Sequence, residues 1–515
     1  MKPPPFSGHD PQDSGAQYLE DLATGYWFSE LLFTAVELQI FSRLEPAGST
    51  VARIAGTLQL DGPALERFFQ ALCSVGLVTH SDGVFYNTKI ASLYLVKGKE
   101  CYQGNSILWR KYLAAPWGNL KGSLKAGGRV YDPVPEEPEQ LTERIHEYIR
   151  AMDDVAKTKA EEILPLFGSL SGHILDVGAG SGAVSAGFLH RFPGTRATLM
   201  DLPAVLQFSA GLPAARSLGD RAGFCAANLL QPWPVSKGAF DLVILSNVLH
   251  AYAQDEAVHL LDQGLECLNS EGLLLIHDFF LEHRSEKASL FDLNMLLNTF
   301  NGKVFAAKWV REQLASRGLH ATDLIPLRSD TGVLIAARDA AQLNELLLDP
   351  VSLLAARIRG LGFRNACPIP VDSVLVPEWT DMRCRFGCGG FGRLQCPPNS
   401  PSPAKTREVL RDYSHALLLE GEPPTGDFQR KVLEAEKEAF QAGFYKSFAY
   451  WAGPCSLCKQ GCPEDGPCRN TRLARPSMEA SGIDVFETVR RAGFSLRPLK
   501  NKDDYARYFA LLLLE

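Results

Sequence analysis

Residues 173–189 read HILDVGAGSGAVSAGFL, which is an apolar segment followed by a glycine-rich loop and the start of a helix. The apolar segment predicts a buried strand, and Gly178, Gly180 and Gly182 allow the backbone to turn tightly and approach a ligand closely. The helix behind the loop offers its first N–H groups to a negatively charged group. Because Ala183 also completes the pattern G-x-G-x-x-A, a dinucleotide fits as well, and the loop alone leaves the ligand open.

The next apolar segment, ATLMD, narrows the choice of cofactor. It ends at Asp201, nineteen residues after Gly182, where a carboxylate can accept hydrogen bonds from both ribose hydroxyls of an adenosine cofactor. Asp176 lies at the end of the strand before the loop, as in the pattern DVGxGxG, and Leu202-Pro203 opens a helix that can flank the adenosine. These features favour S-adenosylmethionine over NAD.

The sequence on both sides of the glycine-rich loop indicates several domains. Strands and helices alternate from His173 to about Arg338, which predicts an α/β, Rossmann-like domain with a parallel sheet. Before it, three helical segments and an Asp82-Gly83 hairpin signal follow the order of a winged helix. The predicted parts are a disordered stretch 1–17, a helical winged-helix domain 18–100, a helical connector 101–165, the Rossmann-like domain 166–340 and an α+β cysteine-rich domain 351–515.

Composition and charge limit the partners. The chain has 515 residues and a formal net charge of −7, which gives no electrostatic footprint for nucleic acid. The helix that would read DNA in a winged helix carries only Glu66 and Arg67 as charges, a poor set for phosphate contact. No apolar run approaches the length of about 18 residues that a membrane span needs. We therefore expect a cytoplasmic protein without a nucleic-acid or membrane partner.

Residues 15–340 resemble the class of O-methyltransferases that includes caffeate-type plant enzymes, acetylserotonin methyltransferase and bacterial small-molecule methyltransferases. The matching pieces are LDVGAGSG, MDLPAV, AANLLQPWP, FDLVILSNVLHAYAQDEAVHLL, LLLIHDFFL and DLNMLLNTFNGK, in the family's order and spacing. The resemblance implies an S-adenosylmethionine-dependent methyltransferase that acts on a small molecule. It also implies a homodimer, because the family uses its winged N-terminal region to pair subunits.

The resemblance also implies roles for single residues. His250 stands where the family has its general base, and Asp278 stands where plant members have a Glu that helps to hold that base. Asn228 stands where the family usually has an Asp beside the adenine, and Ser246 is placed at the methionyl end. The cofactor-binding set so implied is Asp176, Gly178, Gly180, Gly182, Asp201, Leu202, Asn228, Leu229 and Ser246.

The sequence departs from this family at the base. The family's H-D-W reads His250-Ala251-Tyr252, so one orienting carboxylate is missing. A hydroxyl acceptor attacks the sulfonium methyl only when its proton leaves, whereas an acidic thiol needs no base. The acceptor is therefore left open between a hydroxyl, a thiol and a related group.

Seven of the twelve cysteines lie between residues 384 and 468. A cytosolic chain rarely keeps disulfides, so this density indicates metal or redox chemistry. The text CSLCKQGCP approaches the compact run of iron–sulfur proteins, whereas only Cys455 and Cys458 have good zinc-knuckle spacing. We predict one or two [4Fe–4S] clusters, with zinc as the alternative. The expected metal ligands are Cys384, Cys388, Cys396, Cys455, Cys458, Cys462 and Cys468.

Residues from about 365 to 495 resemble a family of predicted metal-binding proteins of unknown function. The pieces that match are CRFGCGGFGRLQCPPNSPSP, AGPCSLC and CPEDGPCRNTRLARPSMEASGIDV. The resemblance implies metal binding without implying a reaction. Spacing does not tell which cysteines share a cluster, nor whether a cluster is structural, binds substrate or transfers electrons.

Two functions are compatible with these patterns. The first is a methyltransferase with an iron–sulfur domain fused behind it. The second is a redox-sensing or metal-delivery protein whose methyltransferase half binds cofactor without turnover. The altered H-D-W favours the second, and the intact glycine loop favours the first. The first is also favoured by an apolar substrate region, formed by Phe291, Met295, Leu296 and Phe300.

Overall fold

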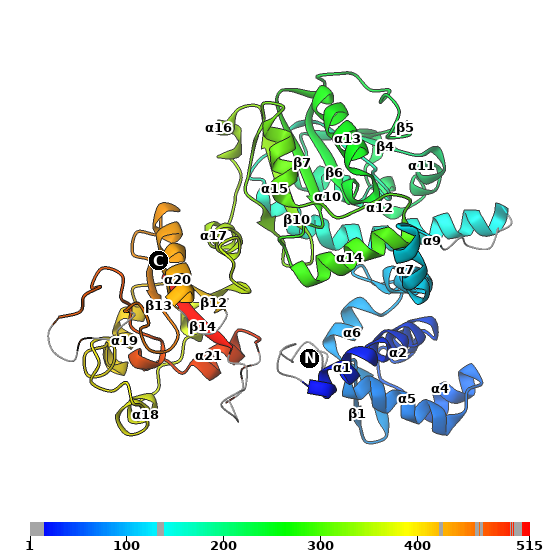
Figure 1. Cartoon of the computed structure of the whole chain (residues 1–515). Coiled ribbons are helices and arrows are strands. Elements are labelled where there is room, and N and C mark those ends of the chain that lie inside the picture. The colour runs from blue at the N-terminus through cyan, green and yellow to red at the C-terminus, as the bar shows by residue number, and fades with distance from the viewer. Residues whose placement is uncertain are drawn as a thin grey trace. The chain divides into compact units, whose positions relative to one another are not determined.

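The structure is a computed structural model that describes residues 15–130, 138–421, 426–458, 463, 467–494, 496, 498 and 507–515. Two compact units can be told apart, one holding residues 22–347 and the other residues 348–515 (Figure 1). The stretch 1–17, expected to be disordered, lies mostly outside the described residues, and its last part already belongs to helix α1 (Gly15–Ala23). No helix in the described ranges has both the length and the apolar character needed to cross a membrane.

The first unit begins with a small helical domain that ends in a hairpin. Asp61 begins its longest helix by accepting a hydrogen bond from the backbone N–H of Ala64. Asp82 and Gly83 both have positive φ, as the two-residue turn of a hairpin requires, so the hairpin signal is confirmed. The elements are α2 (Tyr26–Glu37), α3 (Ile40–Arg43), α4 (Val51–Leu58), α5 (Gly62–Ser74), β1 (Val78–Ser81), β2 (Val84–Asn87) and α6 (Lys89–Tyr94).

The connector is helical, as expected, and one buried carboxylate joins its main helices. These are α7 (Gly104–Ala114), η2 (Ala115–Asn119), α8 (Leu120–Ala126) and α9 (Pro138–Ile163). Asp154 in α9 accepts hydrogen bonds from the backbone N–H groups of Asn105 and Ser106 in the first turn of α7. The carboxylate thus satisfies N–H groups that a helix cannot pair internally, and it fixes α9 against α7.

The larger part of the first unit is built on an eight-stranded sheet in the order β5-β4-β3-β6-β7-β10-β8, with β9 also paired to β10. Strands β3 to β7 are parallel, and β10 is antiparallel to β7. The strands are β3 (Gly172–Val177), β4 (Thr195–Asp201), β5 (Ala222–Ala226), β6 (Phe240–Ser246), β7 (Leu268–Asp278), β8 (His320–Ala321), β9 (Ile325–Pro326) and β10 (Gly332–Ala337). The strand order reverses between β3 and β6, so a crevice is expected at their carboxyl ends.

Helices cover both faces of this sheet (Figure 1). They are α10 (Ala183–Arg191), α11 (Pro203–Ser209), α12 (Pro213–Arg216), α13 (Gln254–Cys267), α14 (Ser285–Asn298), α15 (Ala307–Ala315) and α16 (Ala340–Leu343). The central strands read as continuous apolar runs because both of their faces are buried. The Rossmann-like fold class is confirmed, with antiparallel strands added at one edge.

The second unit is an α+β domain on a four-stranded antiparallel sheet, in the order β11-β12-β14-β13. The strands are β11 (Asn365–Pro370), β12 (His415–Gly421), β13 (Phe448–Tyr450) and β14 (Tyr508–Leu514), and the helices are α17 (Pro350–Arg359), α18 (Trp379–Gly387), α19 (Pro403–Leu410), α20 (Gly426–Gln441) and α21 (Val485–Arg491). Two apolar clusters bury the sheet on its two faces. The described cysteines of the predicted metal set lie outside the strands, in α18 and in loops.

Candidate active site and cysteine centre

The glycine loop follows β3 and is held by Asp201 at the end of β4. Gly178, Gly180 and Gly182 all have positive φ, and a Cβ at Gly178 would lie 2.9 Å from the side chain of Val248. The backbone N–H of Gly180 donates to Oδ2 of Asp201 at 2.8 Å, and that of Leu202 donates to Oδ1 at 2.7 Å. Burial raises the pKa of Asp201. Both oxygens keep lone pairs for further donors, which is compatible with the predicted ribose contact.

Asp176 faces the domain interior. Its Oδ2 accepts a hydrogen bond from the Ser185 hydroxyl at 2.6 Å, so it joins the end of β3 to α10. The residue is 2% exposed, and burial raises the pKa of its carboxyl to about 6. This geometry gives Asp176 a supporting place under the loop.

Asn228 and Leu229 follow β5, the strand that pairs with β4, and β4 ends at Asp201. Oδ1 of Asn228 accepts a hydrogen bond from the backbone N–H of Leu230 at 3.0 Å, while the residue stays exposed. Leu229 is buried and packs near Gly178. An exposed amide above an apolar floor suits the edge of an adenine ring.

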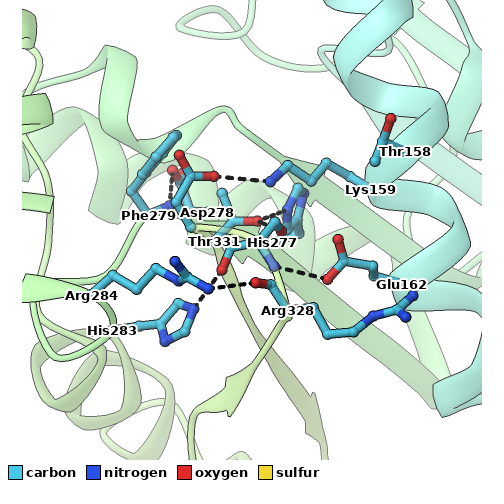
Figure 2. A network of polar contacts seen from close by, with 12 residues as sticks. Thr158, Lys159, Glu162, His277, Asp278, Phe279, His283, Arg284, Arg328 and Thr331 are labelled. Carbon is cyan, nitrogen blue, oxygen red and sulfur yellow. Dashed lines mark hydrogen bonds and ion pairs between the residues drawn. The ribbon is translucent and has the colours of Figure 1, made fainter. Parts of the chain in front are cut away.

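Ser246, at the end of β6, belongs to a chain of hydrogen bonds that motif reasoning missed. Its hydroxyl lies 2.8 Å from Nδ1 of His277, and Nε2 of His277 lies 2.8 Å from the Thr331 hydroxyl. Figure 2 shows the imidazole beside Thr331 in this network. Burial lowers the pKa of His277 to about 3, so the ring is neutral at physiological pH and one nitrogen donates while the other accepts. The sequence signal was a histidine inside the apolar strand LLLIHD.

Asn247 is a second residue that sequence reasoning missed. It has a φ of 57°, a left-handed conformation that Asn tolerates better than most residues. Its backbone N–H donates to the carbonyl of His277 at 2.7 Å. Its Oδ1 is buried and has no hydrogen-bond partner within the described part of the chain. A buried acceptor of this kind, next to Ser246, is suited to a donor group on a ligand.

His250 and Asp278 meet at the carboxyl ends of neighbouring strands. Nδ1 of His250 lies 2.5 Å from Oδ1 of Asp278, and the backbone N–H of His250 donates to Oδ2 at 3.2 Å. The backbone N–H of Phe279 donates to Oδ1 as well. The carboxylate therefore fixes both the backbone and the ring of His250, and it supplies an orienting carboxylate although Ala251 replaces the family's Asp.

Aromatic side chains flank the His250 ring. The rings of Phe279 and Phe291 stack on each other at 3.8 Å, and both stand edge-on to His250, at 5.9 and 5.1 Å between centroids. Met295 is buried in α14, whereas Phe300 is 88% exposed beside Arg129. The expected apolar substrate region thus reaches His250 through Phe291, and Phe300 is not part of a buried wall.

The first cysteine group lies at the end of α18 and in the loop after it. The backbone N–H of Gly390 donates to Sγ of Cys388 at 3.4 Å. A Cβ at Gly390 would lie 3.4 Å from the sulfurs of both Cys388 and Cys396. Sγ of Cys384 points to the carbonyl of Glu479 at 3.8 Å, and a pocket opens beside it, lined also by Phe391, Pro398 and Ser400.

The second group gathers around Asn470. Its side-chain amide donates to Sγ of Cys458 at 3.1 Å, and its backbone N–H donates to Sγ of Cys468 at 3.4 Å. Cys455 packs against the apolar core of the second unit, and Cys462 lies outside the described residues. Over the described ranges, no three Cys, His, Asp or Glu side chains are close enough to hold one metal ion. The candidate ligands are all sulfurs, and N–H groups are directed at Cys388, Cys458 and Cys468, which suits zinc or an iron–sulfur cluster.

Family models match three parts of the chain. A model of the O-methyltransferase dimerisation domain matches residues 20–97, and one of the O-methyltransferase domain matches residues 134–320. Residues 20–97 and 134–320 therefore carry the two domains of an O-methyltransferase. A third model, described as a predicted metal-binding protein, matches residues 367–514. Both resemblances seen in the sequence are confirmed. The protein is a methyltransferase whose C-terminal domain matches the family of predicted metal-binding proteins.

Relatives of the methyltransferase part come from bacteria and animals. A 3-hydroxy-5-methyl-1-naphthoate 3-O-methyltransferase of Streptomyces sahachiroi is 27% identical over 318 residues, which cover 59% of this chain and 91% of that protein. An acetylserotonin O-methyltransferase of Macaca mulatta is 28% identical and covers 56% of this chain and 88% of its own length. The solved structure of human N-acetylserotonin methyltransferase in complex with SAM covers 64% of this chain and all of its own, with 22% identity and a TM-score of 0.56. The last comparison supports the fold.

Proposed function

We propose that this methyltransferase moves the methyl group of S-adenosylmethionine to a hydroxyl of a small molecule, with His250 as the general base. The observation that carries the proposal is the 2.5 Å contact between Nδ1 of His250 and Oδ1 of Asp278, next to aromatic walls. S-adenosylmethionine supplies an electrophilic methyl on a sulfonium. The names of the relatives, which describe O-methylation of small molecules, support a hydroxyl acceptor.

The residues around the glycine loop fit this cofactor. We assign the ribose hydroxyls to Asp201, the adenine edge to Asn228 and Leu229, and the loop contacts to the backbone of Gly178, Gly180 and Gly182, with Leu202 beside the adenosine. Ser246 is assigned to the methionyl end. Oδ1 of Asn247, which is buried and has no partner among the residues that the structure describes, can accept a hydrogen bond from the ammonium group there. Asp176 supports the loop from below through Ser185.

His250 and Asp278 then handle the proton of the acceptor. The bond to Asp278 holds the ring with Nδ1 toward the carboxylate, which leaves Nε2 to take the hydroxyl proton as the oxygen attacks the methyl. The same carboxylate stabilises the imidazolium that forms, as in other His–Asp pairs. Phe279 and Phe291 exclude water from one side of the base and provide an apolar surface for the body of the acceptor.

We further propose that the cysteine-rich domain holds one or two [4Fe–4S] clusters, with zinc as the alternative. The ligands would come from Cys384, Cys388, Cys396, Cys455, Cys458, Cys462 and Cys468. Bound metal supplies folding energy to a small domain, and this structural role is the one we assign. The dimerisation-domain match supports a homodimer paired through residues of about 15–100.

One experiment tests the methyltransferase assignment and the fused domain together. Protein purified without oxygen is analysed for iron, sulfide and zinc, and its conversion of S-adenosylmethionine to S-adenosylhomocysteine is measured with a panel of phenols, alcohols and thiols. Turnover with a hydroxyl acceptor supports the proposal. Binding of S-adenosylmethionine without turnover on any acceptor would favour a redox-sensing or metal-delivery protein instead.

A further inference from the structure

Asn470 contacts two cysteines that lie ten residues apart in the sequence. Its Nδ2 donates to Sγ of Cys458 at 3.1 Å, and its backbone N–H donates to Sγ of Cys468 at 3.4 Å. The first contact joins two residues that are twelve positions apart in the sequence. One residue therefore holds both sulfurs through two different N–H groups.

The position of Asn470 is itself fixed. Its carbonyl accepts hydrogen bonds from the backbone N–H groups of Leu473 and Ala474, at 2.9 and 2.8 Å, so a turn begins at this residue. Just after the turn, the Arg475 guanidinium pairs with Glu436 of α20 at 2.5 Å, with both side chains largely buried. The sulfurs are thus tied to the packed part of the domain by a short path.

The first cysteine group has a similar arrangement. The residue two positions after Cys388 is Gly390, and its N–H donates to that sulfur at 3.4 Å. Asn470 likewise stands two positions after Cys468. In each case a second cysteine, Cys396 or Cys458, lies beside the donor residue. The two pairs therefore share the backbone N–H donor two positions after one cysteine, and Asn470 in addition donates from its side chain to the second sulfur.

N–H groups directed at sulfur stabilise thiolates and orient metal-bound cysteines. Two thiolates at one place repel each other unless a cation and such donors offset their charge. Uncharged thiols would not need a side-chain amide for this purpose. The arrangement around Asn470 is therefore that of two ligands and one supporting residue.

We propose that Cys458 and Cys468 bind the same metal centre and that Asn470 is the positioning residue that holds both sulfurs toward it. This inference rests on the proposed metal binding of the domain. It specifies which two cysteines ligate the same metal centre. Metal enters as thiolate bonds form, and the two thiol protons are released to solvent. Cys388 and Cys396 lie together beside Gly390, and we do not include them in the centre around Asn470.

The test uses the full chain, reduced, freed of metal and titrated with Co²⁺ without oxygen, with the sulfur-to-cobalt charge-transfer absorbance as the readout. Asn470→Ala removes the amide that contacts Cys458 and keeps the backbone N–H. We expect it to weaken Co²⁺ binding at one centre by about 10- to 100-fold. Asn399→Ala is the matched control, because Nδ2 of Asn399 donates to the carbonyls of Gly392 and Arg393, both at 3.2 Å, and to no sulfur within the described part of the chain.

A double-mutant cycle separates positioning from loss of fold. If Asn470 acts through Cys458, Asn470→Ala adds no further loss in a Cys458→Ser chain. Equal Co²⁺ affinity of Asn470→Ala and the unchanged chain would overturn the inference and leave metal binding intact. Equal losses in the Asn470 and Asn399 variants would also overturn it. A chain that shows no thiolate absorbance with Co²⁺, or with iron and sulfide, would instead overturn metal binding itself.

A second measurement serves if Asn470→Ala does not fold. Cys458→Ser, Cys468→Ser and the double variant are compared by the number of Co²⁺ equivalents bound. Loss of the same single equivalent in all three supports one shared centre. Loss of two equivalents in the double variant would place the cysteines in different centres and overturn the inference.

Discussion

His250 lies in the short 3-10 helix η5 (Leu249–Ala251) just after β6, Asp278 ends the neighbouring parallel strand β7, and Nδ1 of His250 meets Oδ1 of Asp278 at 2.5 Å. The carboxylate also accepts the backbone N–H of His250, so it sets the position of the residue as well as the tilt of its ring. A base held at two points loses little freedom when an acceptor binds. This contact explains how the site can keep an oriented base although Ala251 stands where the family has an Asp.

The base is tested by His250→Ala and Asp278→Asn. We expect His250→Ala to lower kcat by about 100-fold or more, because a general base contributes that much to proton removal. Asp278→Asn should lower kcat by a smaller factor and change KM for S-adenosylmethionine little, since Asp278 is not among the residues proposed to bind the cofactor. S-adenosylhomocysteine formation measures both, and His190→Ala, an exposed histidine of the same domain, is the control. Full turnover by His250→Ala would show that His250 is not the general base.

The ribose contact is tested by Asp201→Ala. We expect the affinity for S-adenosylmethionine to fall by about tenfold or more, which is about 1.4 kcal/mol. The carboxylate also holds the N–H of Gly180, so the loop loses a support along with the ligand contact. Calorimetry measures the change, with Asp220→Ala as the exposed control. An unchanged affinity would contradict the assignment.

Asp176 predicts a dependence of stability on pH. Its pKa rises from an ordinary value of 3.8 to about 6 in the folded chain, so the folded state binds the proton more tightly than the unfolded state. Its contribution to the free energy of unfolding therefore decreases as the pH rises from about 4 to 6, by on the order of 2–3 kcal/mol in total. Urea unfolding of the unchanged chain and of Asp176→Asn at several pH values measures it. The difference between the two curves should change across this window and stay constant above it.

The glycine loop and Asp201 could be predicted from local rules, namely a strand end, a tight turn and a helix start, whereas His250 is predicted from the resemblance to the family's H-D-W motif. His277 and Asn470 could not be predicted in either way. The partner of His277 is Thr331, 54 residues further on, and only the antiparallel pairing of β10 with β7 brings them together. No spacing rule anticipates a contact that depends on which edge of the sheet a late strand joins.

The second unit shows the same limit. The C-terminal segment reads as an apolar chain end, yet β14 is a central strand between β12 and β13. Its leucines are buried because β12 pairs with it over its whole length, β13 pairs with Leu511–Leu513, and apolar clusters cover both faces of the sheet. The apolar sequence predicts burial. The strand order depends on pairing between segments about 90 residues apart, and local periodicity carries no information about such partners.

If α2 lies in the dimer interface, a mutation in α2 should lower the molar mass of the protein in solution. Tyr26 and Trp27 are 63% and 59% exposed at the start of this helix, which is more aromatic surface than a lone chain is expected to show to water. We expect a dimer by light scattering at micromolar concentration, and a shift to monomer in Trp27→Glu. Phe224→Glu, at an exposed aromatic of another domain, should leave the mass unchanged. A monomer for the unchanged chain contradicts the pairing.

Metal removal should act on one unit only. If the centre is structural, a chelator strong enough to strip it removes binding energy from the folded second unit, so the thermal transition of that unit moves to lower temperature. The first unit has its own apolar core and its own sheet, so its transition and its affinity for S-adenosylmethionine should stay the same. Calorimetry with and without S-adenosylmethionine identifies which transition belongs to which unit, because the ligand raises only the one that binds it. Loss of methyl transfer at an unchanged cofactor affinity would show that the metal takes part in the reaction and would contradict a purely structural role.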